Sequence, residues 1–373
     1  MNFIVPTLLG LESFCARELK RMGYDTQVED GRVMFSGDEY AVADANINLR
    51  TGERVLIKVA EFEALTFEEL FENTKNAPWS DYIPCGGAFP VKGHSLKSQL
   101  ASVPDCQKII KKAVASKLGE KYGFEKVPED GELYQIQFSI RKNIVTLMID
   151  TSGAPLHKRG YRTLHNLAPL RETIASAMVM LSYWKYETPL VDPFCGSGTI
   201  PIEAVMFKKN IAPGINREFA AENFSYIQNS VWKQAREKAK SLERDIPLEV
   251  YGYDINPECV NISEENARKS GTDKYIKFAQ KDVRKFSVEE NCGSVICNPP
   301  YGERLGEKKE CYNLYADMGK GFRNYDMWSY YILASDEDFE KHIGQKADKK
   351  RKVYNGMIKC NIYQYFDKMH KIK

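Results

Sequence analysis

The fold is decided by ten residues near the middle of the chain, Leu190-Val191-Asp192-Pro193-Phe194-Cys195-Gly196-Ser197-Gly198-Thr199. This stretch predicts a short apolar strand, a glycine loop and a helix from Thr199 to about Phe207. Glycines let a loop backbone approach a ligand where a Cβ would clash, and the helix N-terminus offers N–H groups without partners inside the helix. A pyrophosphate-binding loop would carry a third glycine, which is absent here. The pattern therefore predicts a ligand-binding loop in an α/β sheet.

Two later apolar runs, each predicted to be a strand, are followed by an acid. Residues 248–253 lead into Asp254, and residues 276–280 lead into Asp282. Ligands of open α/β sheets lie beyond the carboxyl ends of the strands, where an acid after the second strand accepts hydrogen bonds from ribose hydroxyls. Each acid alone is more typical of a helix cap or a turn, but their order along successive strands favours binding. Because the gap from the glycine loop to Asp254 far exceeds the ~20 residues of a simple nucleotide-binding unit, residues 208–247 are interpreted as an inserted helical excursion.

A further apolar run, residues 294–297, is followed by Asn298-Pro299-Pro300-Tyr301. An amino group conjugated to a heteroaromatic ring is a poor nucleophile because its lone pair is delocalised. The Asn298 side-chain oxygen and the Pro299 carbonyl can accept the amino protons, the prolines stiffen the loop, and Tyr301 offers a stacking face. The run predicts alkylation of an amino group on a nucleobase, although alone it fits a proline-rich turn equally well. Cys297, the nucleophile that cytosine-C5 chemistry would need, is interpreted as a core residue.

Together these motifs resemble the class I S-adenosylmethionine-dependent methyltransferases that modify exocyclic amino groups of adenine, cytosine or guanine. The resemblance implies an α/β fold with a Rossmann-like seven-stranded sheet over residues 165–373 and a final hairpin at Asn355-Gly356. It implies S-adenosylmethionine as the cofactor, with Ile255 under its adenine and Asp282 accepting from the adenine amino group. The catalytic residues that it implies are Asn298, Pro299, Pro300 and Tyr301.

The same family carries a donor-binding motif just before the first strand of the sheet, and Ala168-Pro169-Leu170-Arg171-Glu172-Thr173 matches it. A proline near the start of this segment suits the first turn of a helix. The full cofactor-binding set implied by the resemblance is Pro169, Leu170, Thr173, Asp192, Phe194, Cys195, Gly196, Ser197, Gly198, Thr199, Asp254, Ile255, Asp282, Val283 and Asn298.

Length and composition limit the class of protein. A chain of 373 residues with 43% hydrophobic content should form two or three packed domains. No run approaches the ~20 apolar residues of a membrane helix, and the first residues lack the basic start of a signal peptide. Nine cysteines are scattered singly, and the five histidines show no metal-ligand spacing. These features predict reduced thiols in the cytoplasm, no metal site and no membrane partner.

The first half of the chain predicts two smaller α+β units. Residues 1–63 alternate as β-α-β-β-α-β, which is typical of a ferredoxin-like unit. Residues 64–155 contain a lysine-rich helix from about Cys106 to Tyr122 and two final strands. Residues 1–91 carry 8 Lys and Arg against 15 Asp and Glu, whereas residues 92–171 carry 14 against 7. Such asymmetry is expected where one face meets phosphate, although a solvated lysine-rich helix would also produce it.

The second unit resembles the THUMP module of RNA-modifying enzymes through Ser95, Lys97, Ser98 and the lysine-rich helix. This resemblance implies RNA as the partner and residues 156–164 as a linker to the catalytic domain. The RNA contacts predicted from this resemblance and from the basic balance of residues 92–171 are Lys92, Ser95, Lys97, Ser98, Lys108, Lys111, Lys112, Lys158, Arg159 and Arg162.

Over its whole length the chain resembles the THUMP-containing guanine-N2 RNA methyltransferases, most closely the bacterial branch that acts on large-subunit 23S ribosomal RNA. Guanine and 23S rRNA, or an assembling large subunit, come from the resemblance alone, because the residues do not distinguish guanine N2 from adenine N6. A transfer-RNA guanine-N2 enzyme would share the architecture. A DNA adenine methyltransferase would lack the THUMP-like unit, and an RNA-binding assembly factor with a relic fold would not need Asp254, Asp282 and Asn298 together. The sequence predicts no oligomeric state.

Overall fold

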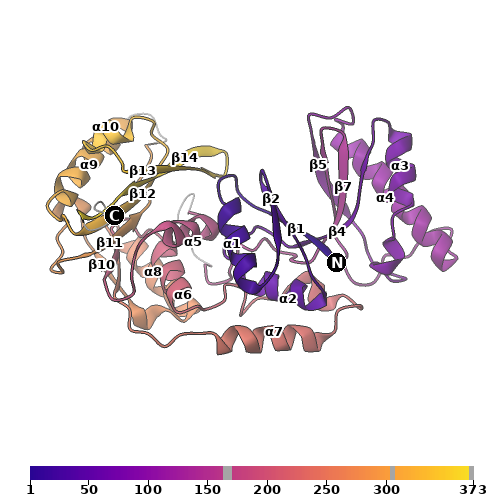
Figure 1. Cartoon of the computed structure of the whole chain (residues 1–373), viewed down its shortest axis with the longest axis horizontal. Helices are drawn as coiled ribbons and strands as arrows, with labels where there is room; N and C mark the ends of the chain where they lie inside the picture. The colour runs from indigo at the N-terminus through magenta and orange to yellow at the C-terminus, as the bar shows by residue number, and fades with distance from the viewer. Residues whose placement is uncertain (163–169, 303–306, 369–373) are drawn as a thin grey trace.

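The chain folds around two sheets, one in each half (Figure 1). The computed structural model describes residues 1–162, 170–302 and 307–368. Within these residues each sheet has seven strands. No helix in this described part combines the length and the apolar character needed to cross a bilayer.

The first sheet is built by residues 2–150 and is covered by helices on one face. Its elements, in chain order, are β1 (Asn2–Pro6), α1 (Glu12–Met22), β2 (Thr26–Glu29), β3 (Arg32–Ser36), α2 (Glu39–Asn48), β4 (Leu56–Glu63), α3 (Phe67–Lys75), η1 (Trp79–Asp81), β5 (Val91–Leu96), α4 (Val103–Tyr122), β6 (Ile136–Arg141) and β7 (Ile144–Asp150). The strand order is β2-β3-β1-β4-β7-β6-β5. Because β4 pairs antiparallel with β7 from Leu56↔Asp150 to Glu63↔Ile144, the two predicted α+β units share one continuous sheet.

Local sequence signals explain where these helices begin and end. The α1 helix ends at Gly23, whose φ of +99° lies in the left-handed region that glycine adopts easily. The Asp38 side chain accepts the Ala41 N–H at the start of α2. Thr66 and Glu69 form a capping box at the start of α3.

The second sheet is the predicted Rossmann-like sheet, and its fold class is confirmed. Its elements are α5 (Glu172–Leu181), β8 (Leu190–Asp192), α6 (Thr199–Lys208), η2 (Ala220–Asn223), α7 (Asn229–Ser241), β9 (Val250–Asp254), α8 (Pro257–Ser270), η3 (Asp273–Tyr275), β10 (Ile276–Gln280), η4 (Val283–Lys285), β11 (Gly293–Cys297), α9 (Glu307–Phe322), β12 (Trp328–Ala334), α10 (Phe339–Ile343), β13 (Lys349–Asn355) and β14 (Ile358–Tyr365). The strand order is β10-β9-β8-β11-β12-β14-β13. Strands β8 to β12 pair in parallel, and β14 pairs antiparallel with both β12 and β13.

The final hairpin has a different turn from the predicted Asn355-Gly356 turn. Asn355 pairs with Ile358 and still belongs to the ladder, so the two turn residues are Gly356 and Met357. Gly356 has a φ of +65°, which the first position of such a tight turn requires and which glycine adopts without strain. The glycine was correctly identified as the turn residue, but the turn lies one residue later.

The inserted residues 208–247 dock on the first half of the chain. Phe219, Phe224 and Trp232 belong to the same buried cluster as the cores of the first sheet. Phe224 stacks on Tyr134 with ring centroids 4.5 Å apart, and α7 lies beneath α2 in Figure 1. The Gly214 N–H donates to the Ile47 carbonyl at 2.8 Å. The excursion is helical only at α7 and the η2 turn, and it adds its aromatic side chains to the core of the first sheet, whereas the second sheet has buried clusters of its own.

Other element boundaries shift by a few residues from the predicted ones. Helix α4 begins at Val103 rather than Cys106, because Pro104 is tolerated in the first turn. Helix α5 begins at Glu172, and Pro169, which was expected near its start, lies outside the described residues. The last strand of the predicted 1–63 unit is β4, which runs from Leu56 to Glu63 past a bulge at Lys58 and Ala60.

Replacing Trp232 with Ala should lower the free energy of unfolding by about 3–5 kcal/mol, because it removes a large side chain from a shared core. Trp232 is buried and stacks on Phe219 at 5.4 Å. Urea denaturation measures the change. Lys233→Ala, on the exposed side of the same helix, is the control and should stay within about 0.5 kcal/mol. Equal small effects from both variants would contradict the docking of α7.

Candidate active site

The predicted ligand-binding residues meet at one edge of the second sheet. The parallel strands β8 to β11 bring their carboxyl ends together there, as ligand sites of α/β sheets require. A cavity of about 680 Å³ opens at this edge. The predicted residues that line it are Phe194, Asp254, Ile255, Asp282, Val283, Asn298 and Pro300. Its remaining wall includes Glu310, Cys311 and Leu314 of α9, a helix that the sequence analysis did not connect with the site.

The glycine loop is fastened to the next strand and the next helix. The Gly196 N–H donates to Asp254 Oδ2 at 3.0 Å, and the Asn256 N–H donates to Asp254 Oδ1 at 2.9 Å. Ser263 Oγ on α8 donates to the Gly196 carbonyl at 2.9 Å. A Cβ at Gly198, whose φ is +78°, would lie 3.1 Å from Ser263 Cβ. The loop therefore needs glycine both for its backbone conformation and for its close approach to α8.

Asp192 has an unusual environment beside this loop. The carboxyl group is buried, and Oδ1 accepts the Phe194 N–H at 3.0 Å. Oδ2 has no hydrogen-bond partner among the described residues. Burial raises the pKa of Asp192 well above its usual range, and the nearby charge of Asp254 adds to that rise. A buried acceptor with an unused oxygen fits a ligand that brings a cationic or hydrogen-donating group to the loop.

Of two residues that line the cavity, Ile255 is exposed, whereas Asp282 already has a side-chain partner. Ile255 is 57% exposed, so an apolar surface faces the opening. The Asp282 carboxylate instead receives the Arg284 guanidinium, from Nε at 2.9 Å and from Nη2 at 2.6 Å. Hydrogen bonds from Arg284 lower the pKa of Asp282. A ligand amino group would therefore share Asp282 with Arg284, a partner that the sequence analysis missed.

The Asn-Pro-Pro-Tyr loop follows β11 as predicted but has unexpected internal contacts. The Tyr301 hydroxyl donates to Asn298 Oδ1 at 2.5 Å, so the predicted amino-group acceptor already has a partner. Tyr301 is half-buried against the core and is not among the residues that line the cavity. Burial raises the pKa of Tyr301 well above its usual range. Tyr315 of α9, which sequence reasoning missed, donates to the Pro300 carbonyl at 2.6 Å and holds the loop from the other side.

Several residues implied for cofactor binding lie away from the cavity lining. Thr173 Oγ1 donates to Glu53 Oε1 at 3.0 Å. Leu170 is buried, and its carbonyl accepts from Arg162 Nη1 at 2.6 Å. Thr199 Oγ1 accepts from the same nitrogen at 3.2 Å. The loop residues Cys195 and Ser197 are buried. Pro299 is buried within the Asn-Pro-Pro-Tyr loop. Cys297 is fully buried, which confirms it as a core residue.

The structure divides the predicted RNA contacts into two groups. The exposed lysines are Lys92, Lys97, Lys108, Lys112 and Lys158. The Ser98 hydroxyl is engaged in the turn, donating to the Leu96 carbonyl and accepting the Asn143 N–H. The Ser95 hydroxyl is buried without a partner among the described residues, and Lys111 binds Glu129 and the Phe89 carbonyl.

Two predicted arginine contacts need correction. Arg159 is buried and donates to Glu203 and to the Leu156 and Arg50 carbonyls, so the prediction that it contacts RNA is wrong. Arg162 is mostly buried and is paired with Glu172 at 3.0 Å. Basic character in the sequence could not reveal this, because Glu203 lies 44 residues along the chain from Arg159 and no local pattern pairs Arg162 with Glu172, ten residues away.

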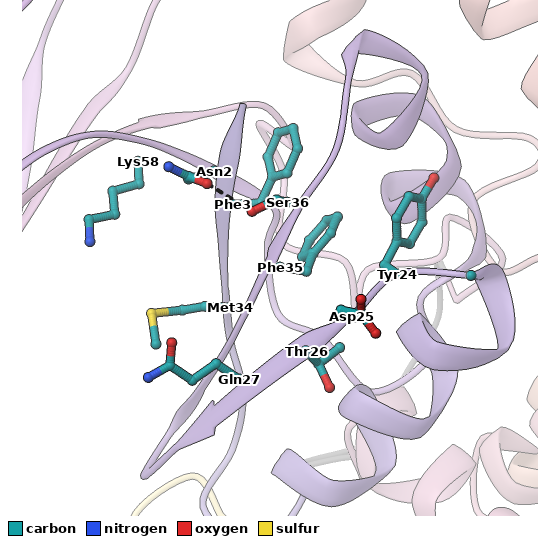
Figure 2. Close-up of a pocket in the computed structure, with 11 residues that line it drawn as sticks. Asn2, Phe3, Tyr24, Asp25, Thr26, Gln27, Met34, Phe35, Ser36 and Lys58 are labelled. Atoms are coloured by element: carbon teal, nitrogen blue, oxygen red, sulfur yellow. Dashed lines mark hydrogen bonds between the residues drawn. The ribbon is translucent and has the colours of Figure 1, made fainter.

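A second cavity, of about 700 Å³, lies beside β1 to β3 (Figure 2). Figure 2 shows Phe3, Phe35 and Tyr24 on one side of these strands and Met34 and Gln27 on the other. The residues that line this second cavity therefore surround a sheet edge and do not converge on one point. None of the predicted site residues lines it, and the candidate site remains the edge of the second sheet.

The fold and the acid-lined edge together define a class I methyltransferase domain. Family models bear this out: an RMKL-like methyltransferase domain matches residues 159–364, an RlmL ferredoxin-like domain matches residues 2–56 and a THUMP domain matches residues 64–150. The chain belongs to the RMKL-like methyltransferase family.

Similar proteins cover the chain almost completely. "Putative RNA methyltransferase YpsC" of Bacillus subtilis (strain 168) is 46% identical over 99% of this chain and 96% of its own length. The ribosomal RNA large subunit methyltransferase K/L of Psychromonas ingrahamii is 32% identical over 98% of this chain, which spans only 50% of that protein. The crystal structure of SMU.472, "a putative methyltransferase complexed with SAH", superposes with a TM-score of 0.94 at 41% identity, covering 98% of each chain.

Replacing Asp192 with Asn should stabilise the ligand-free protein at neutral pH. Because the folded state raises the pKa of Asp192, wild-type folding must take up a proton whenever the unfolded carboxyl is ionised, and Asn removes that cost. Below about pH 4 the unfolded carboxyl is also protonated, so the gain should disappear there. Thermal melting across pH measures this dependence. A loss of stability at neutral pH that is independent of pH would contradict the raised pKa.

Proposed function

We propose that this chain transfers a methyl group from S-adenosylmethionine to the exocyclic N2 amino group of a guanine in 23S ribosomal RNA. At the coarser level it is an S-adenosylmethionine-dependent RNA methyltransferase of the RMKL-like family. The observation that carries the proposal is the position of Asn298 and Pro300 on the same cavity as Asp254 and Asp282. An amino-group acceptor and two strand-end acids therefore face a single ligand space.

The donor fits the residues of the glycine loop. S-adenosylmethionine, when bound, supplies a methyl group activated on a sulfonium sulfur. Asp254 keeps lone pairs for ribose hydroxyls beside the two backbone N–H groups that hold it. Ile255 offers an exposed apolar surface at the cavity mouth, and the unused Oδ2 of Asp192 offers an acceptor next to the loop. These residues would hold the donor in the cavity that Asn298 also lines.

The acceptor side must make the guanine amino nitrogen nucleophilic. Asn298 Oδ1 and the Pro299 carbonyl would accept the two amino protons, which localises the lone pair toward the methyl group. As the N–CH₃ bond forms and the S–CH₃ bond breaks, the sulfur leaves as a neutral thioether, and the methylated nitrogen releases one proton to solvent while the two oxygens only accept hydrogen bonds. The Tyr301 hydroxyl now occupies Asn298 Oδ1, so the amino group has to replace it. Tyr301 would then be released to stack on the base.

The choice of large-subunit ribosomal RNA is supported by the names of the relatives rather than by the site, whereas guanine N2 comes from the resemblance of the sequence motifs alone. The K/L proteins are named for ribosomal RNA of the large subunit. YpsC, which matches this chain over nearly its full length, is named a putative RNA methyltransferase. The exposed lysines on β5 and α4, among them Lys92, Lys108 and Lys112, would bind the phosphate backbone. The amino group must also leave any base stack before it can reach Asn298.

Two substitutions should separate donor binding from catalysis. Asp254→Ala should weaken binding of S-adenosylhomocysteine by roughly 1–3 kcal/mol through unpaired ribose hydroxyls, or about one to two decades. Asn298→Ala should leave that affinity near wild type but lower single-turnover methylation by about 10²- to 10³-fold. Calorimetry and rapid-quench rates measure the two effects. If Asn298→Ala also abolished donor binding, the separate roles would be refuted.

The substrate assignment predicts a specific pattern of methylation. Purified protein and labelled donor should methylate protein-free 23S rRNA better than mature subunits, because a folded subunit buries most internal bases. Bulk transfer RNA is incubated in parallel, and the labelled nucleoside is identified by mass spectrometry. N2-methylguanosine in 23S rRNA is the expected product. Label confined to transfer RNA, or recovered as N6-methyladenosine, would overturn the assignment.

A further inference from the structure

The tip of the last hairpin carries a large apolar side chain with no cover. Met357, in the turn between β13 and β14, is 98% exposed, more than any other large hydrophobic side chain in the described residues. Its neighbour Ile358 is exposed as well. Single exposed apolar residues are common on protein surfaces, so exposure alone does not indicate a function for Met357. Its position relative to the active site does.

The hairpin tip lies on the active-site edge of the sheet. Strand β14 runs antiparallel to β12, and Asn361 pairs with Ala334 at the carboxyl end of β12. Residues before Asn361 therefore extend beyond the edge where β11 ends and the catalytic loop begins. Cys360 Sγ lies 3.9 Å from the Tyr301 hydroxyl, and Asn355 hydrogen-bonds with the same residue. The strand residues on either side of the tip therefore contact the Asn-Pro-Pro-Tyr loop, and Met357 lies beyond them.

The two strands of the hairpin, β13 and β14, form a stalk below the tip. The first half of the chain holds this stalk through β13. Arg351 donates to the Gly10 carbonyl from Nε at 3.0 Å and to Ser13 Oγ from Nη2 at 2.7 Å. Its guanidinium also lies over the Phe14 ring, 4.4 Å from the centroid. A Cβ at Gly10 would clash with the Lys352 carbonyl oxygen. Figure 1 shows the hairpin reaching from the second sheet toward α1, and this anchoring leaves the turn alone in solvent.

Basic side chains surround this stalk. Exposed lysines lie on both strands: Lys349, Lys350, Lys352 and Lys359. Lys350 pairs with Glu340 at 2.7 Å and Lys359 with Glu337 at 3.0 Å, and both lysines remain about half exposed. An apolar tip on a basic stalk fits a nucleic acid, whose phosphates meet the lysines while its base stack accepts the apolar group.

We propose that Met357 is a wedge that enters the base stack of a paired RNA stem when the target nucleotide leaves it for the catalytic loop. This inference rests on the proposed function, because it needs an RNA base as the methyl acceptor. Extruding a base leaves a gap and costs unstacking energy, and apolar side chains such as methionine can fill such gaps between base steps. The rigid stalk would present the side chain at a fixed distance from Asn298. The partner is therefore a base-paired RNA segment that contains the target guanine.

The test compares two RNAs that carry the same target guanine, a stem–loop excised from 23S rRNA and the same strand without its pairing partner. Met357→Ala should lower kcat/KM about tenfold on the stem–loop but leave the unpaired strand within about twofold, because only the stem needs a base extruded. Met357→Leu, which keeps an apolar side chain of similar size, should behave as wild type. Met327→Ala is the matched control: Met327 is also exposed, at 36%, but precedes β12 at the opposite edge of the sheet.

A second readout follows base extrusion directly. The base next to the target is replaced with 2-aminopurine. The fluorescence of the 2-aminopurine in the stem–loop should rise when the wild-type protein binds, but not when Met357→Ala binds. Equal losses of kcat/KM on both RNAs would overturn the wedge in favour of a general RNA contact. No loss of kcat/KM on either RNA would overturn the wedge as well. If the wild-type protein methylates neither RNA, the proposed function itself fails. If the wild-type protein and every variant methylate only the unpaired strand, the proposed function stands but the inference that the substrate is a paired stem is overturned.

Discussion

The hydrogen bond from the Gly196 amide to Asp254 joins the loop after β8 to the end of β9, and the donor cavity depends on this junction. It requires a left-handed glycine on one side, with a φ of +54° at Gly196, and a carboxylate fixed by the Asn256 N–H on the other. Residues at the neighbouring strand ends then fall on the same edge because the strands are parallel. Asp282 and Asn298 reach the cavity for that reason alone, without direct contact with the junction.

A second constraint fixes this edge relative to the first half of the chain. The Glu53 carboxylate, just before β4, accepts from His157 at 2.9 Å, from Thr173 at 3.0 Å and from Arg171 at 3.3 Å. Burial alone would raise the pKa of Glu53, but hydrogen bonds from His157 and Thr173 and the charge of Arg171 lower it overall. Together with the docked insertion, this network makes the two sheets parts of one body. An RNA held by the first half would therefore meet the catalytic loop in a defined orientation.

The parts of the fold that the sequence predicted are those with local signals. The glycine loop, the strand-end acids and the Asn-Pro-Pro-Tyr run each depend on neighbours in the chain, and the structure places Asp254, Asp282 and Asn298 on one cavity. The errors involve side-chain contacts that the sequence pattern does not show, whether the partner is distant, as for Arg159, or only two residues away, as for Arg284. Arg159 was predicted to contact RNA because its segment is basic, but it pairs with Glu203 inside the protein. Tyr315 and Arg284 were missed because no local pattern distinguishes a residue that holds a loop from one that faces solvent.

We propose that this edge methylates guanine N2 in ribosomal RNA with Asn298 as the amino-group acceptor. Nucleoside mass spectrometry of 23S rRNA from a strain that lacks the gene tests it most directly. One N2-methylguanosine should be lost from the 23S rRNA of this strain, the wild-type chain should restore it, and an Asn298→Ala chain expressed at the same level should not. An unchanged 23S rRNA nucleoside profile in the deletion strain, or full restoration by Asn298→Ala, would contradict the account.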